Sequence, residues 1–292
     1  MNYKVFIDTN IFLDFYRIRR ENVSSQYLSL IDKHKDKIIT TYQVEMEYKK
    51  NRQVVILESI KNSKMPDFNT FAPPILLYQS EPVKIIIDSK KTILKKEKEL
   101  KSRFYNILKN PVSNDLAYQT FQRLFKSENE FNLTRKTEEK NLIKELALKR
   151  FLLGYPPRKK DDTSFGDSYN WEWLIHCANK YKIDVIIVSR DSDYGVKIDD
   201  GCILNDWLNQ EFKDRVSKKR KIILTDKLSD AFKLISEKVT KEMENEEKEI
   251  IETRLTESNL IIDNVLLNNK NNLKKAINDL KEELNKYRIH TE

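Results

Sequence analysis

The sequence predicts an α/β fold, in which a parallel sheet carries helices on both faces to give three layers. Short β-prone runs alternate with longer helical patterns, as in sheets whose parallel strands are joined by helical crossovers. Only four of the 292 residues are glycine and 34% are charged, which disfavours an all-β sandwich or barrel with many tight turns. Acidic residues follow several of the β-prone runs, where α/β proteins place their sites.

The expected elements follow in a regular order. Strands are predicted at 3–7, 37–41, 184–189 and 221–225, because each is a short apolar or β-branched run. An amphipathic helix follows the first strand, and a helix from about 43 to 62 follows the second. Residues 66–82 are rich in proline, which predicts a loop, and residues 84–153 have a helical pattern. From residue 228 onward the pattern is helical only.

Two parts of the chain differ in charge. We expect a main domain at 1–236 with a helical insertion at about 55–150, and a helical C-terminal appendage at 237–292. The appendage carries a heptad seam and holds 10 Lys+Arg against 13 Asp+Glu, a net charge of −3, so residues 1–236 carry +11. The seam residues are Leu273, Ile277, Leu280, Leu284 and Tyr287. A basic main domain favours a polyanionic partner.

Several classes of protein are disfavoured. The sequence has neither a glycine-rich phosphate loop nor a dinucleotide-binding fingerprint. Two cysteines and three scattered histidines provide no zinc-ligand set. No apolar run has the length of a membrane span, and the N-terminus lacks a signal-peptide pattern. We therefore expect a cytoplasmic protein with no membrane partner.

Six acidic residues lie where the carboxyl ends of parallel strands would meet. They follow the first strand, begin the helix after the second strand, open the helix after Gly166, or follow the strand at 184–189. They are Asp8, Glu45, Glu47, Asp167, Asp191 and Asp193. Each alone could serve as a helix N-cap or a solvated surface residue. Their joint order instead predicts a site for a hard cation, Mg²⁺ or Mn²⁺, because the donors are all oxygen.

Four segments resemble the motifs of the PIN-domain nucleases. Residues 5–10 (Val-Phe-Ile-Asp-Thr-Asn) resemble the opening strand and first acidic motif of that family. Residues 165–173 and 185–195 are similar to its third and fourth motifs. Residues 43–52 resemble the second motif of a PIN-like subgroup with a long helical insertion, which points to Glu47 in preference to Glu45. The resemblance covers roughly residues 3–236, interrupted by the insertion.

The resemblance implies a metal-dependent endoribonuclease, commonly a bacterial toxin or a phage-defence effector. It implies that one or two ions are held by four carboxylates, and that a fifth adds a ligand or positions water. The four are Asp8, Glu47, Asp167 and Asp191, and the fifth is Asp193. Asn10 and Ser189 would orient these groups from a second layer.

Basic residues near these motifs are candidates for nucleic-acid contacts. We expect such contacts from Arg52 in the second motif and from Arg158, Lys159 and Lys160, which shortly precede Asp167. The stretch 84–110 has nine Lys+Arg against three acids. It is either one wall of a basic groove or a solvated helix face.

Two other functions remain open from the sequence. The same carboxylates would serve a structure-specific DNA nuclease, and a non-catalytic nucleic-acid-binding or assembly protein would need no cleavage. The C-terminal helices could pair with a second subunit, cover the basic groove or pack on their own domain. An antitoxin or defence-system partner is also expected from the resemblance.

Overall fold

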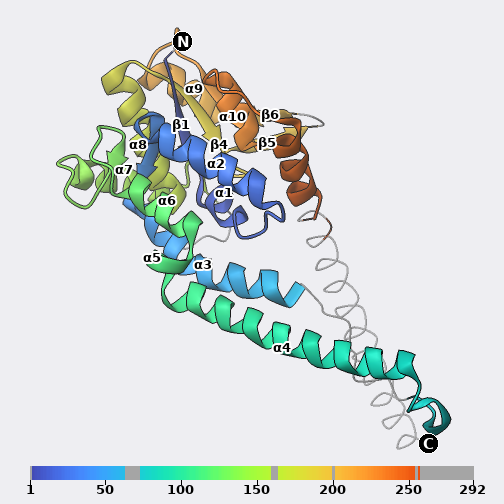
Figure 1. Cartoon of the computed structure of the whole chain (residues 1–292). Coiled ribbons are helices and arrows are strands. Elements are labelled where there is room, and N and C mark those ends of the chain that lie inside the picture. Colours follow the sequence, from blue (N-terminus) through green and yellow to red (C-terminus); the bar gives the residue numbers. More distant parts are fainter. Residues whose placement is uncertain (1, 63–72, 159–163, 199–200, 254–255, 257–292) are drawn as a thin grey trace, which may run out of the picture. The chain divides into compact units, whose positions relative to one another are not determined.

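A five-stranded parallel sheet forms the centre of the protein (Figure 1). The structure is a computed structural model that describes residues 2–62, 73–158, 164–198, 201–253 and 256. The strands are β1 (Tyr3–Ile7), β2 (Ile38–Thr41), β3 (Asn132–Leu133), β4 (Asp184–Val188) and β7 (Ile222–Thr225). Their order is β3-β2-β1-β4-β7, and every neighbouring pair is parallel. The four strands expected from the sequence are confirmed to within a residue or two.

The register aligns the carboxyl ends of the central strands. Ile7 of β1 pairs with Val188 of β4, and Val188 pairs with Thr225 of β7. Asp8 and Ser189 therefore leave the sheet side by side. The amide of Asp8 still donates to the carbonyl of Val188 at 3.0 Å, and this hydrogen bond holds the Asp8 backbone at the edge of the sheet.

Helices cover both faces of the sheet, which confirms the three-layer fold. The N-terminal half supplies α1 (Thr9–Asp14), α2 (Glu21–Lys33) and α3 (Tyr42–Asn62). The C-terminal half supplies α8 (Gly166–Tyr181), α9 (Asp206–Arg215) and α10 (Leu228–Leu234). Helix α8 packs against β2 and β4, whereas α10 packs against β1, β4 and β7. The strand interiors are apolar and buried on both sides, as expected for a central parallel strand.

The insertion is helical but contributes one strand. It contains α4 (Glu81–Lys109), α5 (Pro111–Asn114), α6 (Leu116–Phe125) and α7 (Lys140–Leu152), with η3 (Ile75–Leu77) before them. It begins later than the predicted residue 55, because α3 continues to Asn62 with Val55 buried in the core. Strand β3 was missed, because two residues give no apolar run. The Asn132 side chain instead fixes this strand by donating to the carbonyls of Phe125 and Ser127 at 2.9 and 2.7 Å.

A short hairpin was also missed by the sequence pattern. It consists of β5 (Gly195–Ile198) and β6 (Gly201–Leu204), which pair antiparallel just after the last acidic motif. Gly195 is required here, because an added Cβ would lie 2.0 Å from the carbonyl oxygen of Ile203.

The chain divides into two compact units, Met1–Glu244 and Asn245–Glu292. The division falls beyond the expected residue 236, since Met243 is buried and its carbonyl accepts a hydrogen bond from Tyr27 at 3.3 Å. Residues 241–253 are helical. The heptad seam expected at 273–287 lies outside the described residues. In the described part of the chain, no helix is both long and apolar enough to cross a membrane.

Candidate functional site

Asp8 lies at the point where β1 passes into α1. It caps α1, because one carboxylate oxygen accepts from the Thr9 amide at 2.6 Å. The N-cap role considered from the sequence is therefore real. It uses only one oxygen, however. The other, Oδ2, accepts from Asn10 Nδ2 at 2.8 Å and from Ser189 Oγ at 2.5 Å.

Ser189 joins the first and last acidic motifs. Its hydroxyl donates to Asp8 and accepts from the amide of Asp191 at 3.1 Å. One side chain thus fixes both the Asp8 carboxylate and the start of the loop that carries Asp191 and Asp193. The expectation that Asn10 and Ser189 orient the carboxylates agrees with these contacts.

Glu47 is brought to Asp8 and Asp167 by a close approach between two helices. Its carboxylate accepts from Thr9 Oγ1 at 2.9 Å and from Gln43 Nε2 at 2.7 Å. A Cβ on Gly166 would lie 2.4 Å from Glu47 Oε1, so only glycine leaves room for Glu47 beside the first turn of α8. Gly166 is the first residue of α8, and its role is to allow this contact.

Glu45 points elsewhere. It forms an ion pair with Lys49 at 2.6 Å, one turn further along α3. Of the two glutamates considered from the sequence, Glu47 is therefore the one that lies among the other carboxylates.

The carboxylates lie close enough together to raise the pKa of Asp8 and that of Asp167, and in this sense they form one cluster. Burial, followed by the charges of Asp191 and Glu47, raises the pKa of Asp8 to about 7, although its hydrogen bonds oppose the shift. Burial also raises the pKa of Asp167 well above its usual value, with further contributions from the other four carboxylates of the cluster. We call these five residues the carboxylate cluster: Asp8, Glu47, Asp167, Asp191 and Asp193.

Two polar atoms beside the carboxylate cluster were not anticipated. The Tyr194 hydroxyl is fully buried and has no hydrogen-bond partner among the described residues. Burial raises its pKa, followed by the charges of Asp167 and Asp8. Asn10 Oδ1 is likewise buried without a partner in the described part of the chain. Buried polar atoms are normally paired, so both are candidate contacts for a bound water or ligand.

A sixth carboxylate at this edge of the sheet is neutralised by the protein itself. Asp226 follows β7 and forms an ion pair with Lys197 of β5 at 2.7 Å. Arg190 donates to the carbonyl of Asp226 at 3.2 Å and forms an ion pair with Asp14. These contacts hold the loop between Ser189 and Asp193, and Asp226 is not part of the carboxylate cluster.

The carboxylate cluster fits a divalent cation in charge and donor chemistry. Its donors are oxygens only, and burial, together with repulsion between the carboxylates, raises the pKa of Asp8 and Asp167, so a cation would relieve the repulsion. Over the described residues, however, no three Asp, Glu, His or Cys groups already form a metal-binding set.

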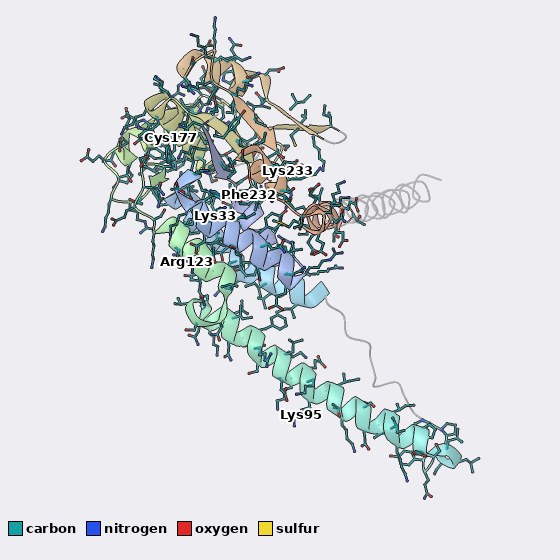
Figure 2. All side chains as sticks on the ribbon, turned by 45° about the horizontal axis from the view of Figure 1, so that its top comes forward. Lys33, Lys95, Arg123, Cys177, Phe232 and Lys233 are labelled. Carbon is teal, nitrogen blue, oxygen red and sulfur yellow. The ribbon has the colours of Figure 1, made fainter. Side chains whose placement is uncertain are left out.

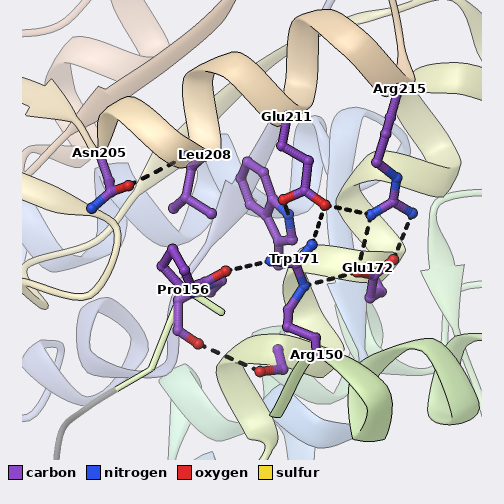
Figure 3. A network of polar contacts seen from close by, with 10 residues as sticks. Arg150, Pro156, Trp171, Glu172, Asn205, Leu208, Glu211 and Arg215 are labelled. Atoms are coloured by element: carbon purple, nitrogen blue, oxygen red, sulfur yellow. Dashed lines mark hydrogen bonds and ion pairs between the residues drawn. The ribbon is translucent and has the colours of Figure 1, made fainter. Parts of the chain in front are cut away.

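A partly buried network of two arginines and two glutamates links α8 to its neighbouring helices (Figure 3). Glu172 of α8 accepts from Arg150 Nε at 2.8 Å and from Arg215 at 2.7 Å. Burial acts to raise the pKa of Glu172, but the two arginines outweigh it and lower that pKa. Glu211 of α9 contacts both arginines and accepts from Trp171 Nε1 at 3.0 Å. The network fastens α7 and α9 to α8, which carries Asp167 in its first turn.

The expectation that Arg52 contacts nucleic acid is wrong. Its side chain is only 3% exposed and donates to Asp115 at 2.6 and 2.9 Å. It also donates to the Tyr16 hydroxyl at 2.9 Å and to the carbonyl of Ile107 at 2.8 Å. A guanidinium surrounded in this way cannot reach a phosphate, and Arg52 instead fastens α3 to the insertion.

The other basic candidates lie in the loop before α8. Arg158 is half-buried, with its guanidinium 4.4 Å from the centre of the Phe151 ring and hydrogen-bonded to the Phe151 carbonyl at 3.0 Å. These contacts hold the loop on the end of α7. Lys159 and Lys160 lie outside the described residues, so the expectation for them stays a prediction.

The fold and the carboxylate cluster together define a class: α/β proteins whose acidic side chains gather at the carboxyl edge of a parallel sheet. Residues 5–194 match the PIN domain, and the chain belongs to the PIN-domain family. The match spans all five cluster residues and the insertion. PIN domains in general are metal-dependent nucleases. No curated protein and no solved structure matches the chain significantly.

Proposed function

We propose that this protein is a divalent-metal-dependent endoribonuclease. The observation that supports this most strongly is the carboxylate cluster in a PIN domain, where burial and the neighbouring carboxylates raise the pKa of Asp8 to about 7. Burying carboxylates side by side destabilises the protein by itself and is typical of a site that works with a cation.

Asp8, Glu47, Asp167 and Asp191 would hold the ion, Mg²⁺ or Mn²⁺, and Asp193 would add a ligand or position water. The ion would supply an activated water and stabilise the negative charge that develops on the scissile phosphate. The protein's own contribution is to prepare the donors. Asn10 and Ser189 hold one oxygen of Asp8, and Thr9 and Gln43 hold Glu47.

RNA is proposed as the substrate, and DNA is the alternative. The net charge of +11 on residues 1–236 supports a polyanionic substrate of either kind. Cleavage of matched RNA and DNA oligonucleotides by the purified protein separates the two. A protein that binds RNA but gives no metal-dependent products would instead be a binding or assembly protein.

We further propose a role as a bacterial toxin or phage-defence effector, controlled by an antitoxin or defence-system partner. The experiment is induction of the wild type beside Asp8→Asn, followed by sequencing of RNA 5′ ends. New ends in the wild type alone support the role and identify the target. Identical ends in both strains would refute cleavage through Asp8.

The helical C-terminal segment is proposed to mediate self-association. The support is its heptad seam at 273–287. Truncation after residue 244, where the first compact unit ends, should lower the mass measured by light scattering. An unchanged monomer would contradict this proposal.

A further inference from the structure

Helix α4 is a long basic helix whose function the carboxylate cluster does not explain. It spans 29 residues, Glu81–Lys109. Among its described residues only Val83 is fully buried. Figure 2 shows its side chains standing along the helix, with Lys95 among them. Its main packing partner is α5, at its C-terminal end.

The lysines of α4 are not spread evenly around the helix. At 3.6 residues per turn, five of them fall within an arc of about 60°. We call these five the lysine row: Lys84, Lys91, Lys95, Lys98 and Lys109. The opposite side is apolar, with Ile93, Phe104 and Ile107 half-buried. The row therefore faces away from the side on which α4 packs.

Acidic residues neutralise the other lysines in preference to the row. Lys96 pairs with Glu99 at 2.8 Å and Lys101 with Glu97 at 2.7 Å, and both lysines lie outside the row. Within the row, Lys91 alone forms an ion pair among the described residues. Its partner is Asp88, and both side chains are 73% exposed, where such a pair contributes little.

The dimensions and chemistry of the row suit a nucleic-acid backbone. At 1.5 Å per residue, Lys84 and Lys109 are about 38 Å apart. That length corresponds to about 11 phosphates, if successive phosphates of one strand are spaced about 3.4 Å apart. The row contains no arginine to read a base edge, and a base stacked on the exposed Tyr105 beside it would be held whatever its identity. It would therefore bind phosphates without regard to sequence.

We propose that the lysine row binds the phosphate backbone of the substrate RNA, as a contact separate from the carboxylate cluster. The inference rests on the proposed function for the identity of the ligand. In the described part of the chain, no hydrogen bond or ion pair links the row to the cluster. The row therefore contributes affinity for long RNA and leaves the reaction itself unchanged.

The test compares two full-length variants with the same loss of four charges. The row variant carries Gln at Lys84, Lys91, Lys95 and Lys98. The control variant carries Gln at four cations of α4 outside the row, namely Lys90, Lys96, Lys101 and Arg103. Circular dichroism checks that both retain the wild-type helix content. Binding of a labelled 30-nucleotide RNA is measured by fluorescence anisotropy in EDTA over a range of salt concentrations.

We expect the row variant to bind the RNA at least about tenfold more weakly than the wild type. The slope of log affinity against log salt concentration should become less steep by about 3. The control variant should stay within about twofold of the wild type, since its cations lie outside the row. Equal losses in both variants, or none in either, would overturn the proposal. So would unchanged RNA affinity with loss of binding to anionic lipid vesicles.

A cleavage assay separates this inference from the proposed function. The row variant should cleave a hexanucleotide RNA with wild-type kcat/KM and the 30-nucleotide RNA with lower kcat/KM. If neither RNA is cut even by the wild type, the proposed function fails, and the binding comparison still decides whether the row binds RNA.

Discussion

Replacing Asp8 with Asn should remove much of the pH dependence of folding stability. Burial and the neighbouring carboxylates raise the pKa of Asp8 to about 7 in the folded protein, against 3.8 ordinarily. As pH rises, Asp8 therefore loses its proton near pH 4 in the unfolded chain but only near pH 7 in the folded chain. Asp8 thus lowers the free energy of unfolding progressively from about pH 4 to about pH 7, and the effect is constant above that.

The magnitude follows from the width of this window. One pKa unit corresponds to about 1.4 kcal/mol, so two units between pH 5 and pH 7 correspond to about 3 kcal/mol. Asparagine does not titrate. It also changes the hydrogen bonds that Asp8 receives, but by an amount that is the same at each pH. Relative to Asp8→Asn, the wild type should therefore lose about 3 kcal/mol between pH 5 and pH 8.

The assay is urea unfolding followed by tryptophan fluorescence, in EDTA, at pH 5, 6, 7 and 8. Glu45→Gln is the matched control, because Glu45 pairs with Lys49 away from the carboxylate cluster and its loss should leave the wild-type pH dependence. Added Mn²⁺ should restore the stability that the wild type loses at high pH. Parallel pH profiles for the wild type and Asp8→Asn would refute the crowding of charge at Asp8.

Two further substitutions distinguish a residue that shapes the carboxylate cluster from one that stabilises the fold. Gly166→Ala places a Cβ 2.4 Å from Glu47 Oε1, which should move the end of Glu47 and lower cleavage by about tenfold, while the melting temperature stays unchanged or rises because Ala favours helix. Gly201→Ala, with open space around its Cβ, is the control, and equal activity of both variants would contradict the role of Gly166. Arg52→Met should cost about 3–5 kcal/mol in urea unfolding, because it leaves Asp115 buried without its cation. The folded fraction should bind RNA as the wild type does, and weaker binding without loss of stability would contradict the structural role of Arg52.

The central fold could be predicted because its signals are local. Four strands are short apolar runs, and the register that follows places Asp8 beside Ser189. Strand β3 could not be found in this way. It has two residues and depends on the Asn132 side chain and on pairing with β2, which lies about 90 residues earlier in the chain.

The acidic residues could be predicted, but not the roles of their neighbours. Glu47 was selected over Glu45 by resemblance, and the contact with Gly166 provides the physical reason. Arg52 was expected to contact nucleic acid because a charged residue in an acidic motif is normally exposed to solvent. Its partner Asp115 lies 63 residues away, and only the folded insertion brings the two together.

Metal-dependent cleavage of RNA is the most direct test of the proposed nuclease function. Purified full-length protein and Asp167→Asn are each incubated with end-labelled RNA in Mg²⁺, Mn²⁺ or EDTA, after circular dichroism has shown that both are folded. The wild type should cut the RNA only when a divalent ion is present. Asp167→Asn should be slower by about 100-fold or more. Cleavage by the wild type in EDTA, or undiminished cleavage by Asp167→Asn, would contradict the proposed function.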